Sequence, residues 1–250
     1  MNRISKLVAL ITLIVFISCN KEENTTDTNY QSKKTELSHN LTSKSGNTTI
    51  EPADYGFYHN EAIKLYNEKY LQGDITKLKN TDAKKVINDL LILMKEKYPN
   101  EFDNVDTSEF LTYFDSSTTT GKFDFFDNWN KNKSIYIKNG YVSQKVSFLI
   151  DDVIANGTDY LSIINIITTF KNNNELTNSE TNSVLVFQSV IENSHNLWNN
   201  NNPFSKKNPC TPRTIIADAG TSAIFFYGGP FGVLAGAASS LFVYYSDPSC

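Results

Sequence analysis

Residues 214–245 read TIIADAGTSAIFFYGGPFGVLAGAASSLFVYY, and this stretch decides the fold. No residue from Ala219 to Ser246 is charged, which is a length that a membrane-spanning helix could use. Gly228-Gly229-Pro230 interrupts the stretch, because this combination of residues favours a turn over a continuous helix. The sequence therefore predicts a hairpin of two helical arms, from about Thr214 to Tyr227 and from Phe231 to Tyr245.

Small residues recur at every fourth position of this stretch. Gly228, Gly232 and Gly236 follow the spacing, which lets two helices approach closely, so we interpret them as helix-packing glycines. Arms of roughly 14 and 15 residues would be about 21 to 23 Å long, short of a hydrocarbon core of about 30 Å. Three interpretations follow. The hairpin completes the protein core, or it is a membrane-active element resembling the glycine-zipper segments of bacteriocin-like and outer-membrane proteins, or the segment spans a membrane permanently.

The N-terminal segment carries Arg3 and Lys6, then an apolar run, and ends at Phe16-Ile17-Ser18-Cys19. This order is typical of a secretory leader. The small residue before Cys19 makes the segment resemble the lipobox of bacterial lipoproteins, with Phe16 in place of the more usual leucine. The resemblance implies a signal peptide over residues 1–18 and a lipid on the sulfur of Cys19, which would hold the protein to the lipid of the outer membrane.

The residues after Cys19 carry a second resemblance. Lys21, Glu22 and Glu23 resemble the surface export signal of Bacteroidota lipoproteins, in which a lysine and two acidic residues closely follow the cysteine. The resemblance implies display on the outer face of the outer membrane, and an ordinary solvated charge run is the alternative. Residues 19–50 contain almost nothing apolar, so we expect a flexible tether between lipid and domain.

Two cysteines flank the apolar hairpin. With Cys19 lipidated, Cys210 and Cys250 remain, an even number in an exported chain. A straight helix would hold them far beyond disulfide reach, whereas a hairpin would bring them together. We therefore predict a disulfide between them, with two free thiols as the alternative. Closing a loop of about 40 residues would stabilise the fold by about 4 kcal/mol.

The net charge of the chain indicates which classes of binding partner are unfavourable. The chain has 23 basic and 27 acidic residues. Because Arg3 and Lys6 lie in the leader, the mature chain would carry 21 basic against 27 acidic residues, a net charge near -6. This balance argues against nucleic acid or anionic lipid as a general partner.

Residues 51–209 show helical periodicity, and no part of them alternates convincingly with the period of a strand. Thr81-Asp82 is expected to cap a helix that Pro99 ends, and a shorter helix is expected after Asp106. Residues 122–140 are expected to be a loop. The fold class predicted is all-α, a helical bundle over 51–209 followed by the apolar, disulfide-closed hairpin over 210–250.

Three helices are expected in the second half of this body. The first carries a stripe from Val142 to Ile154 and stops at Asn156-Gly157. The second begins at Asp159. Thr177-Asn178-Ser179-Glu180 has capping-box spacing and opens the third. The apolar residues expected to face inward are Leu161, Ile164, Ile167 and Phe170 in the second helix and Val184, Phe187, Ile191, Ser194 and Trp198 in the third.

The titratable residues form no catalytic pattern in the sequence. His59 and His195 belong to no His-Glu-x-x-His motif; a joint site of the two is an option, and capping or half-buried packing is the expectation. Asp127–Asn132 alternates oxygen ligands like a calcium loop but lacks its glycine and closing glutamate, so we expect a polar loop. Asp218 is expected to favour a helix N-terminus. We therefore predict no metal, no cofactor and no enzymatic activity.

A broader resemblance joins three parts of the chain. Tyr55–Asn60, Val190–Trp198 and Ile216–Gly220 are similar to a group of uncharacterised Bacteroidota lipoproteins with helical bodies and glycine-rich ends. This resemblance implies no known activity and supplies no catalytic residues. The function expected is a surface-exposed, lipid-anchored interaction module for an unknown protein or glycan ligand. The alternatives are a membrane-active protein that uses the hairpin and a glycan-directed enzyme.

Overall fold

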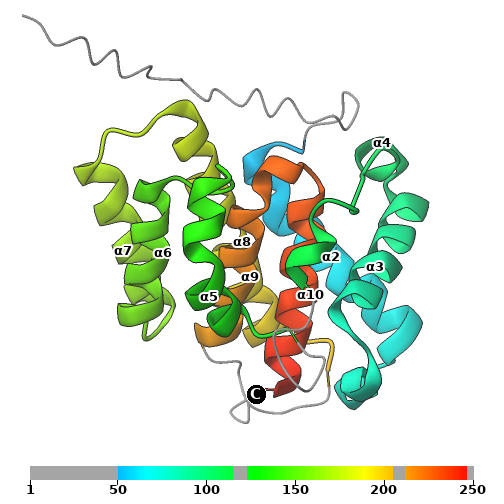
Figure 1. The fold of residues 1–250 in the computed structure, drawn as a ribbon. Helices are drawn as coiled ribbons and strands as arrows, with labels where there is room; N and C mark the ends of the chain where they lie inside the picture. The colour runs from blue at the N-terminus through cyan, green and yellow to red at the C-terminus, as the bar shows by residue number, and fades with distance from the viewer. Residues whose placement is uncertain (1–49, 115–122, 205–211, 247–250) are drawn as a thin grey trace, which may run out of the picture. The chain divides into compact units, whose positions relative to one another are not determined.

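The computed structural model describes residues 50–114, 123–204 and 212–246 (Figure 1). All regular structure in these ranges is helical and none of it is strand, so the predicted all-α fold class is confirmed. Several sequence predictions concern residues outside the described ranges. They are the signal peptide, the tether up to residue 49, Cys19, Lys21, Glu22, Glu23, Cys210 and Cys250.

The described chain contains nine α-helices joined by shorter helical elements. The α-helices are α2 (Tyr55–Tyr66), α3 (Ala83–Lys97), α4 (Pro99–Phe102), α5 (Phe125–Lys138), α6 (Gln144–Asn156), α7 (Tyr160–Asn173), α8 (Asn178–Asn200), α9 (Pro212–Ile224) and α10 (Phe231–Ser246). The short elements are the 3-10 helices η1 (Pro52–Asp54), η3 (Ile75–Asn80), η4 (Leu111–Phe114) and η5 (Phe226–Gly228) and the π-helical turn η2 (Asn67–Leu71).

The N-terminal caps agree with the sequence signals. The Asp82 carboxylate accepts the backbone N–H of Lys85 at 2.7 Å and so begins α3. The predicted capping box of α8 is present, with Thr177 and Glu180 each accepting the other's backbone N–H. Each such cap satisfies N–H groups that have no partner within the helix, and is typically worth about 1 kcal/mol.

The segment expected to be a loop is mostly helix α5. Asp124 caps this helix by accepting the backbone N–H groups of Phe126 and Asp127 at 2.8 and 3.2 Å. Trp129 and Tyr136 are buried on one side of the helix. The residues between them are mostly asparagine and lysine, so the apolar periodicity of this helix is weak in the sequence. The segment Asp127–Asn132 therefore lies inside a helix, where successive side chains spread around the axis and do not converge on an ion.

Two other expectations are wrong in detail. The helix expected after Asp106 is the short 3-10 turn η4. In α7 the predicted inward residue Leu161 is 70% exposed, and Ile163 and Ile167 are the buried positions. The predicted face advanced in steps of three residues, and each step falls short of a full turn. After three steps the shortfall is about half a revolution, so Leu161 and Phe170 lie on opposite sides.

The predicted hairpin is present and forms the middle of the bundle. Figure 1 shows α9 (orange) and α10 (red) between α5–α7 on one side and α3–α4 on the other. α9 packs on α8, α5 and α6, and α10 packs on α2 and α3, while the two arms pack on each other. Every residue from Phe231 to Tyr244 is buried. The interpretation of the hairpin as core therefore describes this fold.

The hairpin turns where the sequence breaks. Gly229 has a φ of +60°, a conformation that residues with a side chain rarely adopt, and η5 precedes it. In the part of the chain that the structure describes, no helix combines the length and the apolar character needed to cross a membrane.

Candidate functional site

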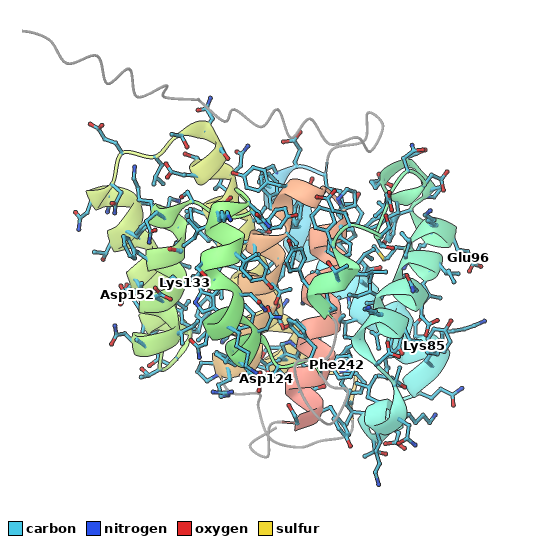
Figure 2. All side chains as sticks on the ribbon, in the orientation of Figure 1. Lys85, Glu96, Asp124, Lys133, Asp152 and Phe242 are labelled. Carbon is cyan, nitrogen blue, oxygen red and sulfur yellow. The ribbon has the colours of Figure 1, made fainter. Side chains whose placement is uncertain are left out.

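A surface groove of about 460 Å³ lies between the α2–η2 segment and α3. Its floor is apolar, because Leu65 is half-buried and Leu93 is buried. Charged residues border it, and Figure 2 shows one of them, Glu96, projecting outward from α3. The residues that line the groove are Leu65, Glu68, Lys69, Leu93, Glu96 and Lys97. A groove of this size is within the range that small ligands occupy in proteins.

Lys97 connects the groove to the carboxylate of Glu61. The Lys97 ammonium donates to this carboxylate at 2.8 Å, Lys64 donates at 3.1 Å and the Tyr98 hydroxyl donates at 3.0 Å. Partial burial raises the pKa of Glu61, but the hydrogen bonds from Lys97, Lys64 and Tyr98 outweigh it and lower the pKa to about 2. Glu61 is therefore an ionised acceptor held in a fixed position at neutral pH.

Beyond Tyr98 the surface becomes aromatic. The ring of Phe57 is 49% exposed and meets the rings of Tyr58 and Tyr98 edge-on, with centroid distances of 5.2 and 6.3 Å. Tyr58 and Tyr98 are themselves 5.2 Å apart and half-buried. Edge-to-face contacts of this kind fix the relative positions of the rings. We call Phe57, Tyr58 and Tyr98 the aromatic cluster.

The groove, the Glu61 carboxylate and the aromatic cluster form one continuous surface, which we call the α2–α3 face. Its acidic and basic side chains are equal in number around the groove and Glu61, and several of them neutralise each other directly. The acidic residues are Glu61, Glu68 and Glu96, and the basic ones are Lys64, Lys69 and Lys97. Glu101 adds one acidic group beside Tyr58.

A second group of polar residues lies inside the bundle, where α2, α8, α9 and α10 meet. The Asp218 carboxylate accepts the indole N–H of Trp198 at 3.0 Å and lies 3.8 Å from Nε2 of His59. Both His59 and Asp218 are fully buried. Nδ1 of His59 lies 3.1 Å from the side-chain oxygen of Asn60. We call His59, Trp198, Asp218, Ser194 and Ser240 the buried polar cluster.

Burial dominates the chemistry of this cluster. It raises the pKa of Asp218, and His59, Ser240, Ser194 and Trp198 oppose the shift without removing it. The hydroxyls of Ser194 and Ser240 lie near the carboxyl, but neither reaches it with the geometry of a full hydrogen bond. Such unsatisfied groups each cost about 1–3 kcal/mol relative to groups with partners. The cluster is therefore an energetic weak point inside the core.

The buried polar cluster is not arranged like an active site. Its carboxylate and imidazole have no exposed surface, so a substrate has no access to them in this fold. Among the described residues no three His, Cys, Asp or Glu side chains lie close enough together to hold a metal ion.

The histidines and glycines singled out in the sequence have distinct places. His195 stacks on Tyr160, with ring centroids 4.0 Å apart, while His59 is buried against Asp218, so the structure does not bring the two histidines into one site. A Cβ on Gly232 would lie 2.9 Å from the carbonyl oxygen of Ser222 in α9. A Cβ on Gly236 would lie 2.0 Å from the Ser222 hydroxyl. Both glycines therefore lie at the close contact between the arms.

Gly228 has a different neighbour. A Cβ there would lie 2.8 Å from the ring of Phe110, which precedes η4. Phe110 in turn stacks on Phe231, with centroids 4.8 Å apart. The absence of a side chain at Gly228 therefore makes room for the Phe110 ring at the hairpin turn. Gly228 does not lie at the contact between the two arms.

The sequence reasoning missed both groups of residues described above. Asp218 is the one carboxylate between Arg213 and residue 246, so its position in an uncharged stretch was a signal of burial. Phe57 and Tyr58 are adjacent in a predicted helical region. Because neighbouring residues on a helix point in different directions, they cannot both face the core, and the sequence therefore indicates an exposed ring. The expectation that Asp218 serves a helix N-terminus is wrong, because it lies in the second turn of α9 and bonds to Trp198.

None of the family models, curated proteins or solved structures compared with this chain matches it.

Proposed function

We propose that the protein is a lipid-anchored binding module displayed at the cell surface, and that the α2–α3 face is its binding site. The lipobox-like Cys19 and the following Lys21, Glu22 and Glu23 support the anchor and the display. One observation supports the binding site above all: the half-exposed Phe57 ring stands beside a fixed carboxylate and a groove of about 460 Å³. Exposed aromatic residues held rigidly beside polar groups are typical of binding surfaces.

Photo-crosslinking on intact cells tests this proposal. The residue p-benzoylphenylalanine would replace Phe57 in one variant and Phe148 in a control, since Phe148 on α6 is exposed to a similar degree, 57% against 49%. We expect a saturable adduct at position 57 that is absent at position 148 and is lost when Glu61→Gln is added. Equal labelling at both positions, or labelling that ignores Glu61→Gln, contradicts the proposal.

A second candidate function is membrane activity of the hairpin, and one observation favours it. Five buried polar atoms on the described parts of α9 and α10 have no hydrogen-bond partner. They belong to Asp218, Thr221, Ser222, Ser239 and Ser240. Each unsatisfied atom makes the packing of the hairpin into the bundle less favourable than that of a hairpin of the same size with only apolar side chains.

Dye leakage separates the two functions. The purified protein would be added to dye-loaded liposomes of neutral and of anionic lipid. The binding-module proposal predicts no leakage above that of bovine serum albumin. Leakage that Gly232→Leu or Gly236→Leu abolishes would instead establish the membrane-active function.

A further inference from the structure

We propose that the α2–α3 face binds an uncharged saccharide chain, an inference that rests on the binding function proposed above and names its ligand class. The first argument is charge. Around the groove and Glu61 three carboxylates face three ammonium groups, and Lys97 and Lys64 are already paired with Glu61. Glu101 and Asp54 near Tyr58 add acidic groups, so the face as a whole disfavours anions. A phosphate, sulfate or carboxylate on a ligand would compete with Glu61 for these lysines, and a cation would compete with the lysines for Glu61.

The second argument is the combination of groups on this face. The Phe57 side chain is 49% exposed, and the electron density of an aromatic ring attracts the polarised C–H groups of a sugar ring. Glu61, whose pKa is lowered to about 2, stays ionised, and charged acceptors make strong hydrogen bonds with hydroxyl donors. Its side chain is 13% exposed and already accepts three hydrogen bonds, so about one acceptor position remains for a ligand hydroxyl. A pyranose presents C–H groups on one side and hydroxyls at its edge, so it matches both features at once.

The third argument concerns peptides, which are the main rival class. A helical peptide needs a continuous apolar groove for side chains at three- and four-residue spacing, whereas only Leu65 and Leu93 form the floor here. A proline-rich peptide would use the aromatic cluster but has few N–H donors for Glu61. Three donors already satisfy most of the Glu61 carboxylate, so such a peptide would leave its remaining acceptor position unused. The peptide alternative is therefore weaker and becomes an outcome of the test.

The dimensions of the face are compatible with a chain and not only a single ring. Phe57 lies in the first turn of α2 and Lys69 lies in η2, twelve residues later, so the face extends about 18 Å along the helix direction. The aromatic cluster lies at one end and the leucine-floored groove at the other, with Glu61 and Lys97 between them. We therefore expect an oligosaccharide to bind more tightly than its monosaccharide.

The test is an array of uncharged oligosaccharides, acidic oligosaccharides and proline-rich decapeptides, probed with the purified protein and followed by calorimetry. We expect binding to at least one uncharged oligosaccharide, with an affinity that changes less than about twofold between about 50 and 500 mM NaCl, because no net charge is neutralised. Phe57→Ala should weaken this binding by about tenfold, and Phe148→Ala should leave it unchanged, because only the first removes a ring from the face.

Each other result overturns the inference. Binding to acidic oligosaccharides or to proline-rich peptides alone assigns the face to another ligand class. Absence of binding to every uncharged oligosaccharide, together with a site-specific adduct at position 57 on cells, rejects the saccharide but keeps the binding function. Saccharide binding that survives Phe57→Ala places the ligand elsewhere and rejects the α2–α3 face as the site.

Discussion

Asp218 shows how one residue shapes the interior. A carboxyl group in an apolar core is costly when ionised, and its neighbours here are few: the Trp198 indole donates to it, and His59 lies 3.8 Å away. Buried polar groups of this kind add little stability, but they specify how elements meet. Its neighbours come from α2, α8 and α10, so Asp218 links α9 to all three.

Replacing Asp218 by asparagine tests this description. Burial raises the pKa of Asp218 above 3.8, so the folded state prefers the protonated form. The group therefore favours folding most strongly at acid pH, and its contribution falls as the pH rises through the folded-state pKa. An asparagine side chain would be neutral at every pH and could still accept the Trp198 N–H. We expect the stability of Asp218→Asn, relative to that of the parent, to rise by about 1–2 kcal/mol between pH 5 and pH 8.

Urea unfolding at the two pH values provides the measurement. His59→Gln serves as the second variant, because it removes the facing imidazole while leaving the carboxyl in place. A loss of stability in Asp218→Asn that is equal at pH 5 and pH 8 would show that burial does not control this carboxyl.

At the scale of elements, the contact between α9 and α10 depends on missing side chains. A Cβ at Gly236 would lie 2.0 Å from the Ser222 hydroxyl and 2.9 Å from the Asp218 carbonyl oxygen. In a solvent-exposed helix the change Gly→Ala stabilises the fold by about 1 kcal/mol. At Gly236 the crowding between the arms should make the same change destabilising.

We expect Gly236→Ala to lower the free energy of unfolding by about 1–3 kcal/mol, measured by thermal or urea denaturation. Ser222→Ala in the same chain removes the nearer of the two clashing atoms and should restore part of the loss. A more stable Gly236→Ala protein, or a double variant no better than the single one, would mean that the arms are farther apart.

Element by element, the sequence predicts most where caps and apolar spacing coincide. α3 and α8 begin at Asp82 and Thr177 as the capping signals indicate. α5 escaped notice because its buried Trp129 and Tyr136 are separated by asparagine and lysine, which lower the apparent periodicity. In α7 the buried residues are Ile163 and Ile167, and the predicted face differs because steps of three residues do not stay on one side of a helix.

For the candidate site, the sequence predicts the elements but not the meeting of their side chains. Helical periodicity over 51–209 is visible in the sequence, yet the pairing of Glu61 with Lys97 depends on how α2 and α3 pack. The same holds for His59 and Asp218, which are 159 positions apart in the chain. Spacing within one helix carries no information about the neighbour that a residue will meet across a helix–helix contact.

At the scale of the whole molecule, the proposed display depends on the N-terminal residues. We expect Cys19→Ala to release the protein from the membrane fraction, because one lipid-modified residue is the proposed attachment. Protease added to intact cells should digest the parent protein, and replacing Lys21, Glu22 and Glu23 by alanine should protect it. Membrane retention of Cys19→Ala, or full protection of the parent, would contradict the anchor or the outward display.

In this fold α9 and α10 form the core, and we propose that they stay there while the α2–α3 face binds the ligand. Hydrogen–deuterium exchange of the intact protein, with and without liposomes, tests it most directly. We predict that the hydrogen-bonded amides 216–224 and 235–244 exchange only through global unfolding, more slowly than those of α7, and that liposomes do not change their rate. Faster exchange in the hairpin than in α7, or loss of its protection when liposomes are added, would contradict the account.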